Sequence, residues 1–110
     1  MSIDRIGALV RGLAWRGRSG RGYDLVAVPL ESLSLADGGM VLLARGGLAL
    51  WAGCADDVIA DHHSRARFRL ALAAADRAYR VARDGGDAVE RMTLAWDLEG
   101  GEPQAGLSAA

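Results

Sequence analysis

GGMVLLARGGLALWAGCADDVIADHHSRARFRLALAAADRAY, residues 38–79, is the stretch that decides the fold. It opens with two continuous apolar runs, at 40–43 and 48–51, which Gly46 and Gly47 separate. Glycines supply the positive φ angles of a tight turn between antiparallel strands. Continuous apolar runs are typical of strands that are covered on both faces. The stretch therefore predicts a buried β-hairpin that leads directly into a helix.

The residues after the hairpin predict one long helix. It would begin near Asp56 or Asp57, whose carboxylates can cap free amide groups, and end at Gly85–Gly86. Acidic residues gather in its first turns and arginines in its last turns, which complements the helix dipole. At 1.5 Å per residue, such a helix would be roughly 40 Å long.

Two apolar stripes appear when these residues are placed on a helix at about 100° per residue. The first stripe is expected to pack on the sheet and consists of Phe68, Ala71, Leu72, Ala75, Tyr79 and Ala82. The second lies nearly opposite and consists of Ile59, Ala66, Leu70, Ala73 and Val81, joined by His63 and Arg77. Either another element of the chain covers the second stripe, or it binds a partner, which could be a second copy of the chain.

The segments on both sides of this stretch predict further strands. Residues 6–15 and 23–30 fit strands, and Pro29 marks the end or edge of the second one because it cannot donate a ladder hydrogen bond. Between them, RGRSGRG (16–22) is interpreted as a hairpin connection, with a phosphate-binding nest as the alternative. Residues 89–98 are interpreted as the last strand, and 99–110 as a turn and a tail.

Composition limits the class of protein. The chain of 110 residues is long enough for one small domain, with an expected core at about 8–103 and a tail at 104–110. A net charge of −1 argues against nucleic acid or an anionic membrane as partner. All basic residues are Arg, and neither Lys nor Asn occurs, which indicates GC-rich coding and a bacterial source. With no signal-peptide core and no apolar run long enough to cross a bilayer, the expected location is the cytoplasm.

The residue types that carry chemistry do not form a recognisable site. His62 and His63 are neighbours, and neighbouring helix positions point about 100° apart, so the two rings cannot chelate one ion. Cys54 is the only cysteine and is interpreted as a small buried apolar residue. No nucleophile elbow, dinucleotide-binding fingerprint or pair of carboxylates appears. We therefore expect a protein that is not an enzyme and that has no cofactor.

Four short segments, in chain order, resemble a gelsolin repeat. Val28-Pro29-Leu30 with Ser34-Leu35 resembles the "VP…sL" segment before the family's core hairpin, and GGMVLL (38–43) resembles its "GDvFiLd" strand. LALWAG (48–53) is similar to "iyvWvG", and EGGEPQAG (99–106) is similar to the "eGtEPea" that closes such repeats. Together they cover roughly residues 10–106, nearly the whole chain.

The resemblance implies an α+β, gelsolin-like fold: a central mixed five-stranded sheet packed against one long helix and a shorter helix or tail. It also implies binding to actin, or to an actin-like filament, through the exposed face of the long helix. The contacts would come from Ile59, His63, Ala66, Leu70, Ala73 and Arg77. The alternative is a structural or self-associating domain, such as a homodimer, that has lost actin and calcium binding.

The family's calcium site is the main departure from the pattern. Its "GD" carboxylate falls on Gly39, or on Gly38 if the hairpin is shifted by one residue, and neither can supply a ligand. The family's helix Glu falls near 60–62, where Asp61 is the only acid; Asp37 would have to move to contribute. Calcium takes six to eight oxygen ligands, so we expect no calcium site.

Overall fold

A computed structural model describes residues 12–35, 39–82 and 87–104 of the chain. Its strands are β1 (Gly12–Arg16), β2 (Gly22–Val28), β3 (Val41–Arg45), β4 (Leu48–Gly53), β5 (Arg77–Val81) and β6 (Glu102–Pro103). Its α-helices are α2 (Ala55–Ile59), α3 (His62–Ala74) and α4 (Ala88–Glu99), and a short 3-10 turn spans Leu30–Ser32. The predicted α+β class is confirmed.

The strands form one sheet in the order β4-β3-β5-β2-β1-β6. Every pairing is antiparallel. The predicted sheet is therefore wrong in two respects: in the described part of the chain it has six strands and not five, and it is antiparallel and not mixed. The sixth strand arises because the chain returns after α4 and pairs Glu102 and Pro103 with the end of β1.

The predicted hairpin is confirmed as β3 and β4. Gly46 has a φ of 58°, which is the left-handed conformation that the turn requires and that glycine adopts without strain. Both faces of β3 are covered, as the continuous apolar run indicated. Leu42 and Ala44 belong to the core cluster on the α4 side, and Val41 and Leu43 to the cluster on the α3 side.

The single long helix is wrong. The helical segment breaks at Asp61, which has an extended backbone with φ −162° and caps α3 by accepting a 2.8 Å hydrogen bond from the Ser64 amide. The helix then ends at Ala74, because residues 77–81 form a strand between β3 and β2. Tertiary pairing in the middle of the sheet therefore outweighs the helical preference of this alanine- and arginine-rich segment. Gly85–Gly86, the predicted end, lies outside the described residues.

The last predicted strand, 89–98, is also wrong, because these residues form most of helix α4. A capping box starts the helix: Asp87 accepts a 2.9 Å hydrogen bond from the Glu90 amide, and Glu90 accepts one of 3.2 Å from the Asp87 amide. The buried side chains Leu94 and Leu98 are four residues apart and face the core together, as helical spacing requires.

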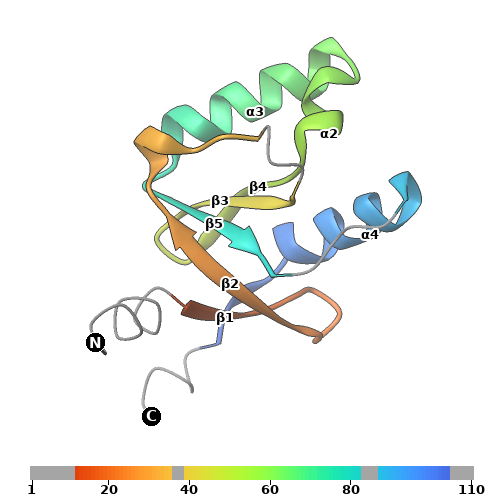
Figure 1. Cartoon of the computed structure of the whole chain (residues 1–110). Coiled ribbons are helices and arrows are strands. Elements are labelled where there is room, and N and C mark those ends of the chain that lie inside the picture. Colours follow the sequence, from red (N-terminus) through yellow and green to blue (C-terminus); the bar gives the residue numbers. More distant parts are fainter. Residues whose placement is uncertain (1–11, 36–38, 83–86, 105–110) are drawn as a thin grey trace, which may run out of the picture.

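Figure 1 shows α2 and α3 on one side of the curled sheet and α4 on the other. The α4 side holds the larger core cluster, which contains Trp15, Tyr23, Leu25, Met40, Leu42, Ala44, Ala52, Tyr79, Val81, Leu94 and Leu98. The α3 side holds Val41, Leu43, Trp51, Ala71 and Ala78. The sheet curls so far that a Cβ placed on Gly47, in the β3–β4 turn, would lie 3.5 Å from Pro103 of β6.

Candidate functional site

The predicted partner-binding residues lie on three different elements. His63, Ala66, Leu70 and Ala73 are exposed along α3. Ile59 is 67% exposed at the end of α2, and Arg77 belongs to β5. Val81, which the helical interpretation also placed on this stripe, is buried in β5. A continuous part of the predicted stripe is therefore present only on α3. Its largest apolar side chain there is Leu70, which is 72% exposed.

A second exposed apolar stripe runs along α4. Val89 is 71% exposed, Met92 69% and Trp96 55%, at the positions i, i+3 and i+7 that share one helix face. Interpreting this segment as a strand hid the stripe. The signal that could have revealed it is the Asp87–Glu90 pair, whose spacing matches a capping box in front of an apolar segment.

Met92 and Trp96 also line a groove of about 420 Å³. The groove follows the outer edge of β4, which supplies Trp51 and Ala52, and lies between α4 and the start of the α2–α3 segment. Its polar lining consists of Asp57, Asp61, Ser64, Arg67, Arg91 and Glu99. The groove thus combines an aromatic and methionine wall with charges of both signs.

Two ion pairs join α4 to the helices on the other side of this groove. Arg67 of α3 lies 3.5 Å from Glu99, and Arg91 lies 3.9 Å from Asp56 of α2. Glu99 also accepts a 2.8 Å hydrogen bond from the amide of Ala52 in the edge strand β4. An edge amide that is already bonded cannot pair with an added strand, so this part of the groove favours side-chain contacts over strand addition.

The RGRSGRG loop connects β1 and β2 as a hairpin. The anionic group that this loop binds is a carboxylate of the same chain. Asp97 of α4, only 4% exposed, accepts hydrogen bonds from the Ser19 amide (2.6 Å), the Ser19 hydroxyl (2.9 Å) and the Tyr23 hydroxyl (2.6 Å). A Cβ on Gly17 would clash with the Asp97 carboxylate, so this close approach requires glycine. The structure therefore supports the hairpin-connection interpretation, with the Ser19 donors occupied by Asp97.

The Asp97 cluster shifts the pKa of both acids in it. Burial alone would raise the pKa of Asp97, but the hydrogen bonds from Tyr23 and Ser19 outweigh it, so the pKa is lowered. Burial raises the pKa of Tyr23 to about 12, and the hydrogen bond to Asp97 and its negative charge act in the same direction. Both shifts favour the ionised carboxylate beside the neutral phenol.

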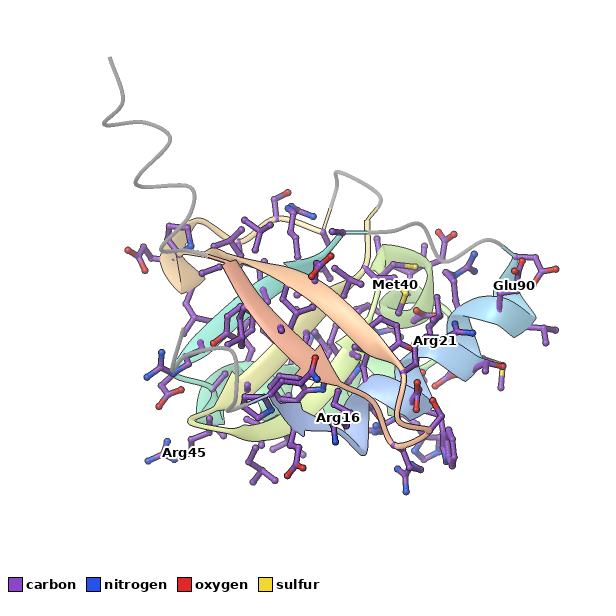
Figure 2. All side chains as sticks on the ribbon, turned by 90° about the horizontal axis from the view of Figure 1, so that it is seen from below. Arg16, Arg21, Met40, Arg45 and Glu90 are labelled. Atoms are coloured by element: carbon purple, nitrogen blue, oxygen red, sulfur yellow. The ribbon has the colours of Figure 1, made fainter. Side chains whose placement is uncertain are left out.

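The same hairpin places arginines beside the exposed stripe of α4. The guanidinium carbon of Arg18 lies 4.3 Å from the centre of the Trp96 ring, within the range of a cation–π contact. Figure 2 shows Arg21 next to α4, and Glu90 at the opposite end of that helix. Arg16 is exposed at the end of β1, directly across the strand pair from Glu102.

The residues considered for metal binding either have structural roles or are not grouped with other possible metal ligands. Asp61 caps α3, and its hydrogen bond from the Ser64 amide lowers its pKa. Cys54 is buried, as predicted. Within the described residues, no three His, Cys, Asp or Glu side chains gather as a metal ion would need; Asp37 lies outside them. In the same part of the chain, no helix has the length and apolar character to cross a membrane.

No family model, curated protein or solved structure matches this chain. The likeness to a gelsolin repeat therefore depends on the four short sequence segments alone.

Proposed function

We propose that this chain is a non-enzymatic protein-binding module that docks a helix of a partner protein against α4 and the adjoining groove. The observation that carries the proposal is the exposure of Val89, Met92 and Trp96 on one face of a helix that is otherwise anchored in the core. Trp, Met and Arg are enriched in protein interfaces, and Trp and Arg dominate their binding energy. Arg18 stacked on Trp96 adds the third residue type.

The shape of the surface favours a helical partner. The three apolar side chains span the eight residues from Val89 to Trp96, which is roughly 10 Å along the helix axis. A groove with Trp51 and Ala52 along its length lies beside them. Recognition of a helix in a groove relies on apolar anchors at this spacing.

Actin, or an actin-like filament, is the partner that the gelsolin resemblance implies. The resemblance would place the contact on the α3 side of the molecule, at Ile59, His63, Ala66, Leu70, Ala73 and Arg77. The exposed Leu70 supports that face as a second candidate. Self-association is the remaining alternative, and it would use either stripe as a homodimer seam.

Two single substitutions distinguish these surfaces. We would compare Met92→Asp and Leu70→Asp with the parent chain in filament co-sedimentation, using actin and a bacterial actin-like protein, and in size-exclusion chromatography. Arg69→Glu, an exposed change on α3, is the control for altered charge. Loss of co-sedimentation in one variant assigns the contact to that helix. A dimeric parent chain that becomes monomeric in either variant would instead show self-association.

If the parent chain is monomeric and sediments with neither filament, then actin-like partners are rejected. The α4 surface remains testable with helical peptides, as described below.

A further inference from the structure

We propose that the partner helix is acidic at one end, and that this end lies over the arginines of the β1–β2 hairpin. The inference rests on the proposed docking of a helix against α4 and adds the chemistry and direction of that helix. It comes from the position of the RGRSGRG loop next to Trp96, which the sequence did not predict.

The hairpin is positively charged where it meets the apolar stripe. Arg18 covers the Trp96 ring, Arg21 lies beside α4 in Figure 2, and both are exposed. Among the described residues, neither guanidinium lies within salt-bridge distance of a carboxylate, although the charge of Arg21 adds to the hydrogen bonds that lower the pKa of the nearby Asp97. The Asp97 carboxylate, which bonds this turn through Ser19, is buried and already accepts three hydrogen bonds. Arginine favours planar carboxylates, which it can bind with two parallel hydrogen bonds.

The charge changes sign along α4. The exposed acids Asp87, its N-cap, and Glu90, in its first turn, lie at one end, and the arginine-bearing hairpin lies at the other. The helix also carries Arg91 and Glu99, but these are paired with Asp56 and Arg67 across the groove. Figure 2 shows Glu90 at the end of the helix away from the hairpin. A partner with acidic residues over Glu90 would meet like charge, while acidic residues over Arg18 and Arg21 would be attracted. Such asymmetry determines the orientation in which a helix binds, and has a smaller effect on its affinity.

The partner helix should run antiparallel to α4. Acidic side chains are most stable in the first turn of a helix, where they interact with its dipole. Placing that first turn over the hairpin puts the rest of the helix along Trp96, Met92 and Val89 in that order. The apolar anchors of the partner would then follow its acidic first turn.

An acidic protein segment fits this surface better than an anionic membrane does. Exposed carboxylates also lie on the strands that adjoin this hairpin, at Asp24 of β2 and at Glu102 of β6, which is paired with Arg16 across the strands. They would repel an anionic membrane surface. The net charge of the chain is −1, which provides no long-range attraction to anionic lipid.

The test is a selection from a displayed library of helical peptides in which both the apolar and the polar positions are randomised. The full chain is the target. We expect enriched peptides with Asp or Glu in the first turn, followed by apolar residues at i, i+3 or i+4, and i+7. Met92→Asp should abolish their binding. Reversing the charge with Arg18→Glu and Arg21→Glu should weaken it at least about ten-fold and should select peptides with Lys or Arg in that turn.

The controls separate this inference from the proposed function. Arg69→Glu should bind the selected peptides as the parent chain does, and circular dichroism should show that every variant is folded. Peptides that depend on Met92 but have no acidic preference, and that ignore the charge reversal, would overturn the inference alone. Failure to select any peptide that depends on Met92 or Trp96 would overturn both. Binding of anionic phospholipid vesicles that requires Trp96, without peptide binding, would overturn both in favour of a membrane surface.

Discussion

The Tyr23 hydroxyl donates a 2.6 Å hydrogen bond to Oδ2 of Asp97, which joins strand β2 to helix α4 across 74 residues of sequence. Ser19 bonds the same carboxylate through its amide and its hydroxyl. These contacts hold the β1–β2 hairpin against α4, and the hairpin in turn carries Arg18 onto Trp96. The buried carboxylate therefore positions the surface on which the proposed function depends.

Alkaline pH should destabilise the protein through Tyr23. Its pKa in the folded state is raised from 10.0 to about 12, so the unfolded chain loses this proton first. The contribution of Tyr23 to stability is complete below pH 10 and is lost as the pH rises from about 10 to about 12. Denaturant unfolding at several pH values should show a fall in the free energy of unfolding over this interval.

The chain has no Lys, so no lysine side chain loses its proton between about pH 10 and pH 12 and complicates the stability measurement. Tyr23→Phe should be less stable than the parent chain at neutral pH and should show a shallower fall above pH 10. Tyr79, the other tyrosine, is present in both proteins and contributes equally. An identical alkaline slope in the two proteins would contradict the role given to the Tyr23 phenol.

Asp97→Asn should lower the free energy of unfolding by about 2–3 kcal/mol at neutral pH. The amide keeps the size of the side chain but removes the negative charge, and hydrogen bonds to charged groups are worth about twice as much as neutral ones. Asp76→Asn is the matched control, because that carboxylate also accepts a backbone hydrogen bond, from Gly46 at 2.9 Å, but its side chain is half exposed. The control should lose less than about 1 kcal/mol. Equal losses in chemical denaturation would show that burial of Asp97 is unimportant.

The parts of the fold that sequence could predict are those governed by local chemistry. The Gly46 turn, the covered β3–β4 runs and the end of β2 at Pro29 all follow from backbone preferences and apolar spacing, and all three are present. The break of the helix at Asp61 also had a local signal, because an Asp three residues before Ser64 can cap a new helix. The two apolar stripes, which continue past Asp61 when the segment is drawn as one helix, favoured an unbroken helix instead.

The errors arise where tertiary contacts decide between two plausible structures. Residues 77–81 contain Ala, Arg and Val on a pattern that a helix also accommodates, and the open position between β3 and β2 makes them a strand. The misassignment of 89–98 then concealed the exposed stripe of α4. The bond between Ser19 and Asp97 spans 78 residues, and no local pattern predicts a contact over that distance.

Trp51→Ala should destabilise the domain by about 3–5 kcal/mol, because removing a buried ring leaves a cavity. Trp51 is 3% exposed, and its ring centre lies 4.9 Å from that of Phe68 in an edge-on arrangement. Trp96→Ala, at a half-exposed tryptophan, is the control and should cost less than about 1 kcal/mol. Urea unfolding measures both. A loss below about 1 kcal/mol for Trp51→Ala would contradict its place in the core.

Calcium should not change the thermal stability of the protein. Both oxygens of Asp61 already accept hydrogen bonds from Ser64, at 2.8 and 3.3 Å, and Gly39 offers no side-chain oxygen. Calcium needs several oxygen ligands at once. Unfolding midpoints in excess calcium and in chelator should therefore coincide, since a ligand stabilises only a native state that it binds. A difference of several degrees would reveal a site.

Leu70→Asp and Phe68→Asp should have opposite effects although the two residues are neighbours on α3. Leu70 is 72% exposed, so a carboxylate there stays in water and the fold should remain intact. Phe68 packs against Trp51 and the α3-side core, where a carboxylate without a partner is costly to bury. Circular dichroism and thermal unfolding should show a folded Leu70→Asp and a largely unfolded Phe68→Asp. If Leu70→Asp unfolds as well, then this face of α3 is not free, and α3 loses its place as a second binding surface while the α4 surface is unaffected.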